Sequence, residues 1–191
     1  MKLNLINIHS VIPCSKVNGP GERVVVFFKG CNRSCKGCFN PETHAESPKT
    51  LTLPRVVLGE LSDHSVVTGI TISGGEPFLQ PSGLAELLRL AKVDYNLTSV
   101  VYSGFTLEEI KADTEKAVAL EFIDVLIDAP FEEDKKEKKL LARGSTNQSF
   151  HFLTDIYSIK DFEIPGKTEI TIDKNGQVIA TGFDSAGLKD I

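Results

Sequence analysis

Apolar, β-branched runs recur along this chain and alternate with segments of helical spacing. Buried strands are predicted at 23–29, 66–72, 97–102 and 122–127. Between them, the apolar spacing predicts helices over 51–61, 82–91 and 106–120, with Ser82 and Thr106 placed as N-caps. Strands that alternate with helices imply parallel pairing through right-handed crossovers, so the sequence predicts an α/β fold.

The pattern changes toward the C-terminus. After Pro165-Gly166, the segments 168–173 and 178–181 have the composition of two short strands. Asn175-Gly176 lies between them and is typical of a tight hairpin turn. We therefore expect a C-terminal β-hairpin, followed by a loose tail over 184–191.

Size and charge limit the classes of function. With 191 residues, of which 41% are hydrophobic, the chain can bury one sizeable core, and one main domain is expected. The formal net charge of −5 argues against nucleic-acid binding, which needs a basic face. Residues 1–12 do not resemble a signal peptide, and no stretch approaches the roughly 20 apolar residues of a membrane span. We expect a soluble, cytoplasmic protein without a membrane partner.

Most of the cysteines are clustered. Cys31, Cys35 and Cys38 lie within eight residues. Ferredoxins bind their clusters with four thiolates, so three at this spacing suggest a 4Fe–4S cube with one iron open to a non-protein ligand. A closed zinc site is the alternative, with Cys14 or His44 as the fourth ligand. A disulfide framework is disfavoured, because thiols stay reduced in the cytosol.

A second motif, Ser73-Gly74-Gly75-Glu76-Pro77, follows the second predicted strand. Paired glycines let the backbone approach a ligand closely and the following acid suits an ammonium group, although such segments also form plain strand-to-helix turns. The cysteine motif follows the preceding predicted strand. Both motifs are therefore predicted at the carboxyl ends of neighbouring parallel strands, where α/β folds build active sites.

Together these motifs resemble the radical S-adenosylmethionine (SAM) superfamily. Further blocks are similar to the activating enzymes of anaerobic ribonucleotide reductases, over about residues 8–153. These blocks are Val17-Asn18-Gly19-Pro20-Gly21-Glu22-Arg23, Phe28-Lys29-Gly30-Cys31, Cys35-Lys36-Gly37-Cys38-Phe39-Asn40, Ile127-Asp128-Ala129-Pro130 and Arg143-Gly144-Ser145-Thr146-Asn147-Gln148. The resemblance lowers the weight of the zinc alternative, because zinc explains none of the later motifs. It implies a partial, open-sided radical SAM (β/α) barrel, since a complete barrel needs roughly 250 residues.

The resemblance also implies cofactors and ligands. Cys31, Cys35 and Cys38 would hold a 4Fe–4S cluster, and SAM would chelate the open iron through its amino and carboxylate groups. The residues implied to surround SAM are Gly37, Cys38, Phe39, Gly74, Gly75, Glu76, Ser103 and Asp128, with the Gly74–Glu76 segment at the methionyl amine. An electron from the cluster would cleave SAM to methionine and a 5′-deoxyadenosyl radical, without a side-chain acid or base.

The implied activity is radical formation on a partner protein, most simply a glycyl radical on an anaerobic reductase-like enzyme, with a flavodoxin-like electron donor. Residues 1–157 would form the radical SAM core and 158–191 a hairpin extension and tail. The family pattern has a glycine where Ala129 stands and a Trp-Thr-Gly-Tyr-like stretch where 102–105 reads Tyr-Ser-Gly-Phe. The alternatives are a radical SAM enzyme that modifies another protein, a peptide or a small molecule, and a metal-binding module without catalysis.

Overall fold

A computed structural model describes residues 4–59, 66–138, 142–163, 168–172 and 178–182. Its main element is a seven-stranded sheet with the order β3-β1-β2-β4-β5-β6-β7. The strands are β1 (Ile6–Ser15), β2 (Arg23–Phe28), β3 (Thr50–Thr52), β4 (Gly69–Gly74), β5 (Thr98–Tyr102), β6 (Val125–Asp128) and β7 (Ser149–Phe152). Neighbours from β2 to β6 pair in parallel, whereas β1, β3 and β7 pair antiparallel.

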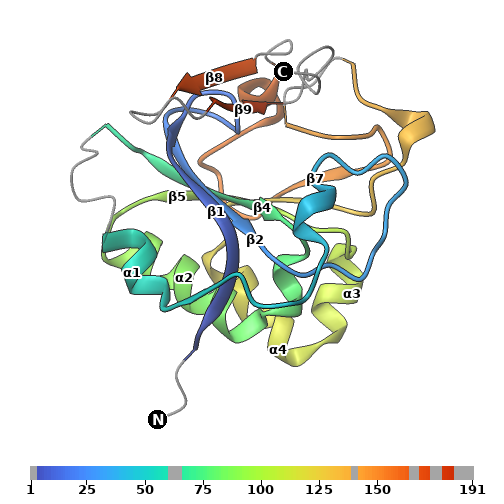
Figure 1. Ribbon diagram of the computed structural model, residues 1–191. Helices are drawn as coiled ribbons and strands as arrows, with labels where there is room; N and C mark the ends of the chain where they lie inside the picture. The colour runs from blue at the N-terminus through green and yellow to red at the C-terminus, as the bar shows by residue number, and fades with distance from the viewer. Residues whose placement is uncertain (1–3, 60–65, 139–141, 164–167, 173–177, 183–191) are drawn as a thin grey trace.

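The α-helices cover one face of this sheet (Figure 1). They are α1 (Pro54–Gly59), α2 (Pro81–Val93), α3 (Leu107–Ala112) and α4 (Thr114–Ala117). Short 3-10 turns are η1 (Pro41–Thr43), η2 (Pro77–Leu79), η3 (Val118–Phe122), η4 (Glu133–Lys135) and η5 (Ile159–Phe162). In the described part of the chain, no helix has the length and apolarity needed to cross a membrane. The predicted α/β class is confirmed.

The four predicted strands pair in parallel as expected, but strands that were not predicted add antiparallel pairs on both sides of them. β1 was not predicted, because polar residues interrupt its apolar pattern. The Asn7 side chain accepts a hydrogen bond from Lys49 N (3.0 Å) and donates one to Ser47 O (3.4 Å). β7 was also missed, and it returns antiparallel beside β6. The sheet is therefore mixed rather than wholly parallel.

Two helix starts differ from the predictions because proline sets them. The helix expected over 51–61 begins at Pro54, after the strand β3, and residues 60 and 61 lie outside the described part. α2 begins at Pro81, so Ser82 lies inside the first turn and is not the N-cap. Proline suits the first helical turn because it has no backbone N–H to leave unpaired there.

The segment predicted as one helix over 106–120 is divided. Thr106 is the N-cap of α3 as predicted, and it forms a capping box with Glu109. The Asp113 side chain then accepts hydrogen bonds from two backbone N–H groups and begins α4. Because η3 follows and extends to Phe122, the next strand begins at Val125 rather than at 122.

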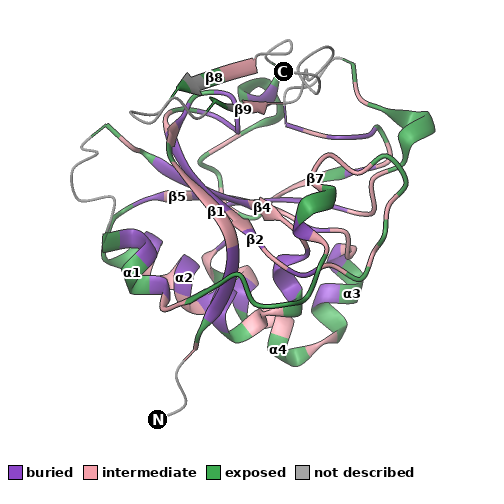
Figure 2. Cartoon of the chain, viewed as in Figure 1, coloured by how far each residue is buried: buried purple, intermediate pink, exposed green. Residues whose placement is uncertain are grey.

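Most of the core lies between the sheet and the α-helices, as the buried colouring in Figure 2 shows. A smaller cluster covers the opposite face and contains Val100, Val125, Ile127, Ala142 and Phe162. Phe162 belongs to η5 and is fully buried. Tyr157 packs against the same cluster, so residues on both sides of the predicted boundary at 157/158 share it.

The predicted C-terminal hairpin is confirmed as the pair β8 (Thr168–Ile172) and β9 (Val178–Gly182), while its turn and the tail lie outside the described residues. It lies on the sheet face away from the α-helices (Figure 1). The Thr181 hydroxyl accepts a hydrogen bond from Asn18 Nδ2 at 3.0 Å. Ile170, Ile172 and Val178 are more than half exposed, so the outward side of the hairpin is apolar.

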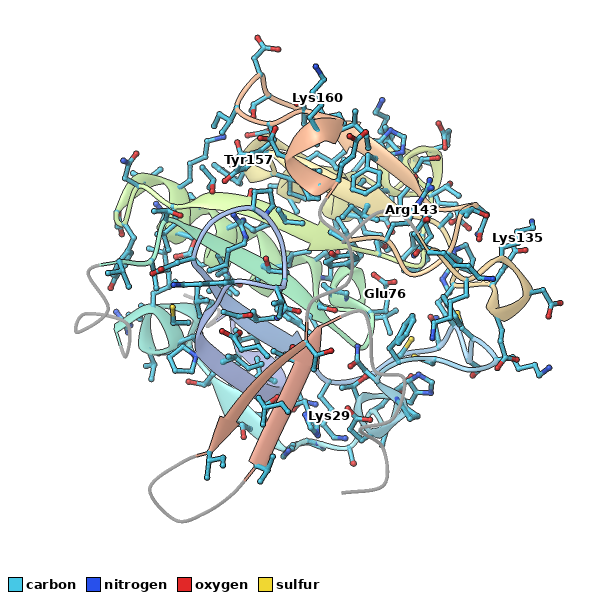
Figure 3. The ribbon with its side chains drawn as sticks, turned by 90° about the horizontal axis from the view of Figure 1, so that it is seen from above. Lys29, Glu76, Lys135, Arg143, Tyr157 and Lys160 are labelled. Carbon is cyan, nitrogen blue, oxygen red and sulfur yellow. The ribbon has the colours of Figure 1, made fainter. Side chains whose placement is uncertain are left out.

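Arg23 spans the amino ends of the parallel strands and is fully buried. Its Nε donates to Thr71 Oγ1 (2.8 Å), Nη2 to Ile70 O (2.7 Å), and Nη1 to Pro20 O (3.0 Å) and Tyr157 OH (3.2 Å). These acceptors are neutral oxygens, and burial lowers the pKa of Arg23. Figure 3 shows Tyr157 beside the η5 turn, so this arginine ties the sheet to the segment after β7.

Gly83 provides a test of the packing between α2 and β1. A Cβ at Gly83 would lie 2.4 Å from Ile6 Cγ2. Helix propensity favours Gly83→Ala by about 1 kcal/mol, but overpacking a buried contact costs about 1–3 kcal/mol. We expect the clash to prevail and the free energy of unfolding to fall by about 1 kcal/mol in denaturant titrations.

Gly59→Ala is the matched control for this prediction. Gly59 is exposed in α1, and nothing lies within 4 Å of its Cβ position. Its replacement should leave the stability equal or slightly higher. A gain in stability for Gly83→Ala similar to that of the control would contradict the close contact with Ile6.

Candidate active site

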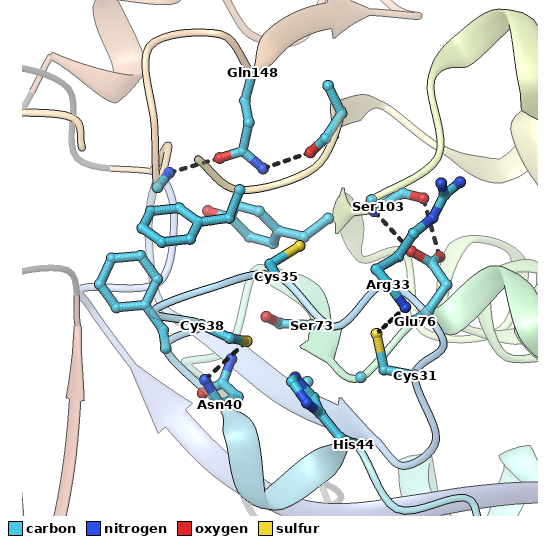
Figure 4. A pocket seen from close by; sticks show the side chains of 18 residues that line it. Cys31, Arg33, Cys35, Cys38, Asn40, His44, Ser73, Glu76, Ser103 and Gln148 are labelled. Atoms are coloured by element: carbon cyan, nitrogen blue, oxygen red, sulfur yellow. Dashed lines mark hydrogen bonds between the residues drawn. The ribbon is translucent and has the colours of Figure 1, made fainter. Parts of the chain in front are cut away.

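The cysteine motif forms the loop that leaves β2. The loop is fixed at its start, because Cys31 N donates to His44 O at 3.0 Å. Cys31, Cys35 and Cys38 all line one pocket, and each is partly buried (Figure 4). The fold therefore brings the three predicted metal ligands to one site.

Two of the three sulfurs accept hydrogen bonds from the backbone. Arg33 N lies 3.5 Å from Cys31 Sγ, and Asn40 N lies 3.4 Å from Cys38 Sγ. Burial raises the pKa of the Cys31 and Cys38 thiols, while these N–H groups lower it. Such donors stabilise a thiolate, and around iron–sulfur clusters they tune the reduction potential. The loop is thus suited to present thiolates to a metal cluster.

Gly74 and Gly75 bring the end of β4 against the segment that leads into the cysteine loop. Gly75 N donates to Phe28 O at 2.9 Å, and Glu76 N donates to Gly30 O at 2.8 Å. Gly74 has a φ of 99°, and a Cβ on Gly75 would lie 2.2 Å from Gly30 O. Because that neighbour is backbone and cannot move aside, both positions require glycine.

Glu76 is 1% exposed, and its carboxylate accepts three hydrogen bonds. Phe78 N and Ser103 Oγ each donate to Oε1 at 3.0 Å, and Gly104 N donates to Oε2 at 2.7 Å. Burial raises the pKa of Glu76, whereas these donors and the charge of Arg33 lower it. Glu76 therefore ties the loop after β4 to the loop after β5 and forms part of the pocket wall.

A second wall combines Phe39, which was predicted at the site, with residues that the sequence analysis did not assign to it. Phe39 and Phe131 meet edge to face, with ring centroids 4.9 Å apart. Gln148 Oε1 accepts from Gly144 N at 2.9 Å, and its Nε2 donates to Ala129 O at 2.9 Å. The blocks at 35–40, 127–130 and 143–148, which resemble known enzymes, were the available signals for parts of this wall.

Gly37 and Asp128, both expected beside the cofactor, do not line the pocket. Asp128 Oδ2 accepts from Leu107 N at 2.6 Å and lies 2.9 Å from His151 Nε2. Gly37 has a φ of 69°, and a Cβ there would lie 2.6 Å from Glu133 Oε1. Asp128 thus holds the start of α3 against β6, and Gly37 permits the tight turn of the cysteine loop.

The pocket contains most of the predicted residues and several others. Those predicted are Cys31, Cys35, Cys38, Phe39, Gly74, Gly75, Glu76 and Ser103. Those not predicted as contacts are Arg33, Asn40, Ser73, Tyr102, Gly104, Ala129, Phe131, Gly144 and Gln148. His44, the fourth ligand of the zinc alternative, also lines the pocket. Cys14 does not; it lies in β1, where its Sγ is 3.9 Å from Glu22 Oε2.

Ala129 adopts a backbone conformation that favours glycine. Its φ is 83°, in the left-handed region that L-residues with a Cβ rarely occupy. Its carbonyl accepts the hydrogen bond from Gln148, and its N donates to Phe105 O at 3.3 Å. These two hydrogen bonds hold the turn after β6 in this conformation although the residue there is alanine.

The comparisons with known proteins agree with this site. A family model described as a 4Fe–4S single cluster domain matches residues 17–151. The anaerobic ribonucleoside-triphosphate reductase-activating protein of Pasteurella multocida (strain Pm70) is 38% identical over 159 residues, which cover 78% of this chain and 99% of that protein. Its namesakes from Escherichia coli (strain K12) and Enterobacteria phage T4 are 34% and 35% identical; the matches cover 78% of this chain and 99% and 96% of those proteins. The chain belongs to this activating-protein family.

Membership of the activating-protein family decides between the chemical alternatives. The chain is a radical SAM enzyme, and its cofactors are a 4Fe–4S cluster and SAM. The zinc site and the module without catalysis are therefore set aside. The family model ends at residue 151, before η5 and the hairpin, while the relatives are matched almost to their full length. About a fifth of this chain thus lies outside its match with those activating proteins.

Replacement of Ala129 by glycine should relieve backbone strain. A left-handed conformation costs an L-residue about 1–2 kcal/mol, and the greater freedom of glycine in the unfolded chain offsets part of that gain. We expect Ala129→Gly to raise the free energy of unfolding by about 0.5–1 kcal/mol in denaturant titrations.

Asn96 is the matched control, because its φ is 53° but asparagine tolerates this region. Asn96→Gly should leave the stability unchanged or slightly lower. A loss of stability in Ala129→Gly would mean that the methyl group contributes more through packing than the backbone loses through strain.

Proposed function

We propose that this enzyme generates a glycyl radical on a partner protein, most simply an anaerobic ribonucleotide reductase. The observation that carries the proposal is the placement of the three loop cysteines and the buried Glu76 around one pocket at the carboxyl ends of β2 and β4. The names of the related activating proteins support the same partner. A cofactor in this pocket would lie between a metal-binding loop and an acidic wall.

In this proposal, Cys31, Cys35 and Cys38 hold the cluster, and SAM lies against the residues that line the rest of the pocket. The proposed SAM neighbours are Phe39, Gly74, Gly75, Glu76 and Ser103, while Gly37 and Asp128 act from behind the pocket wall. When bound, the cluster and SAM would supply reductive cleavage of SAM and the hydrogen abstraction from the partner that follows from it.

The side chains of the pocket would bind and orient the ligand and shield the radical from water. Glu76 provides a buried carboxylate, and an ammonium group of the ligand close to it would favour the ionised form, since an opposite charge lowers the pKa of an acid. Phe39 and Phe131 supply an apolar wall, which helps to exclude water from a reactive radical. No proton has to be held by a side chain for the cleavage step.

We infer a partial, open-sided barrel from the sheet. Parallel pairing links β2, β4, β5 and β6, which is too few strands to close an eight-stranded barrel. An open side would admit a segment of a partner protein. A flavodoxin-like electron donor remains part of the proposal, and the net charge of −5 disfavours a nucleic-acid partner. A cytoplasmic location suits the free cysteines.

A second candidate keeps the radical chemistry but changes the substrate to another protein, a peptide or a small molecule. Two observations favour it. Ala129 replaces the family glycine beside the pocket, and the η5 and hairpin segments lie beyond the family model. The hydrogen donor that is consumed in step with 5′-deoxyadenosine would distinguish the two candidates.

The cluster assignment predicts the metal content of cysteine variants. Anaerobically prepared protein should contain about four iron and four sulfide per chain, the content of a cubane. Serine at Cys31, Cys35 or Cys38 should remove this content, because each thiolate ligates one iron. Cys14→Ser is the control and should leave it unchanged. Loss of iron in the Cys14 variant would mean that the ligand assignment is wrong.

The partner assignment predicts a radical on a second chain. Reduced enzyme, SAM and an anaerobic ribonucleotide reductase as the partner protein should give a glycyl-type electron paramagnetic resonance doublet. We expect the doublet to collapse when the glycine of that protein is deuterated at Cα, because the splitting comes from that hydrogen. The control omits SAM and should give no glycyl-type doublet. If the partner acquires no radical while a small molecule or peptide is consumed, the second candidate replaces the first.

A further inference from the structure

Arg33 connects two loops of the site that are not adjacent in the sheet. It lies in the cysteine loop, and its backbone N–H already donates to Cys31 Sγ. Its side chain extends to the segment after β5, where Cζ lies 3.8 Å from the centroid of the Phe105 ring and Nη2 lies 3.1 Å from Glu109 Oε2. Because β4 separates β2 from β5 in the sheet, this side chain bridges over the intervening Gly74–Glu76 loop.

The receiving end of this bridge is rigid. Glu109 Oε2 also accepts a hydrogen bond from Thr106 N at 2.7 Å in the capping box of α3. The capping box therefore fixes the position of this carboxylate independently of Arg33. Gly104 leaves space for the stem of Arg33, since a Cβ there would lie 2.9 Å from Arg33 Cγ. The stacked, planar guanidinium therefore fits a prepared surface, which lysine could not match.

The same segment is also held by Glu76. Ser103 Oγ and Gly104 N donate to the Glu76 carboxylate, while Arg33 contacts the next residue, Phe105. Arg33 and Glu76 thus fix one segment from two loops, and both line the pocket (Figure 4). The ion pair with Glu109 alone would be weak, because that side chain is 48% exposed; the stacking contact supplies the geometry.

We propose that Arg33 is a positioning residue for SAM. By clamping the cysteine loop to Phe105 and Glu109, it sets the span between the cluster ligands and the Glu76 wall, which the amino-acid part of SAM must bridge. The inference rests on the proposed function only for the place of SAM in this pocket. It requires that loss of the clamp weakens SAM binding while the cluster stays in place.

The test uses the anaerobically reconstituted, full-length enzyme. Arg33→Met keeps an unbranched stem over Gly104 but removes the stacked fork, and Arg33→Lys keeps the charge without the plane. Arg89→Gln is the matched control, because Arg89 pairs with Glu86 within α2 (3.1 Å) and does not line the pocket. For each protein we would measure iron and sulfide content, the dissociation constant of SAM, and the change that SAM causes in the electron paramagnetic resonance spectrum of the reduced cluster.

We expect Arg33→Met to keep its iron and to bind SAM about tenfold more weakly, because the supporting shell of the site is lost. Its cluster spectrum should not respond at SAM concentrations that saturate the wild type. Arg33→Lys should recover only a small part of the affinity, and Arg89→Gln should behave as the wild type. Glu109→Gln should weaken SAM binding less than Arg33→Met does. Glutamine also completes a capping box, so α3 should still begin at the same residue.

Three outcomes would overturn the proposal. Wild-type SAM affinity in Arg33→Met would show that the clamp does not position SAM. Loss of iron together with SAM would place Arg33 in cluster assembly instead. Full recovery in Arg33→Lys would reduce its role to charge alone. A partner protein that acquires no radical would leave these affinities unaffected, so failure of the partner assignment remains a separate result.

Discussion

The site depends on one close approach between two backbone segments. At Gly75, the loop after β4 lies so near Gly30 that no side chain fits between them, and backbone hydrogen bonds on both sides of this contact fix the distance. Since Gly30 immediately precedes Cys31, the contact sets the metal-binding loop and the acidic loop side by side. The parallel pairing of β2 and β4 places the loops after these strands near each other, and the glycines allow the two backbones to come into contact.

The buried carboxylate of Glu76 extends this arrangement to a third loop. A buried acid is costly unless hydrogen bonds satisfy it, and here the donors come from its own loop and from the loop after β5. Removal of the acid would therefore disturb the wall as well as any contact with a ligand. The same carboxylate atoms would contact the ligand and hold the loops together. The two roles are therefore separated only by measuring ligand affinity and protein stability independently.

The sequence predicted the parts of this site that depend on residue type or on local chemistry. The cysteine spacing and the Gly74–Glu76 motif can be recognised from their residue types alone. The capping box of Thr106 is likewise complete within four residues. Long-range contacts decide the rest. The polar residues of β1 mask a strand, and the side-chain partners of Asn7 lie far along the chain; its Oδ1, for example, accepts a hydrogen bond from Lys49 N at 3.0 Å.

The second wall of the pocket was beyond sequence reasoning for the same reason. Phe131, Gly144 and Gln148 reach the cysteine loop only because β7 returns antiparallel beside β6, a pairing that no local pattern signals. Conversely, Gly37 and Asp128 belong to blocks that contain pocket residues, yet they do not line the pocket. In a loop, closeness in sequence to a pocket residue does not show whether a residue lines the pocket. In a strand, by contrast, the alternation of faces predicts which side chains point to the same side.

Arg23 gives the opposite end of the molecule a different response to acid. The hydrogen bonds of its guanidinium end on peptide carbonyls and hydroxyl groups, which have no proton to gain when the solution becomes acidic. Arginine itself stays charged far above neutral pH. Acidification that neutralises carboxylates therefore leaves this brace intact. At the amino end of β2, the hydrogen bonds of a cation thus end on neutral groups, while the pocket at the carboxyl ends depends on the carboxylate of Glu76.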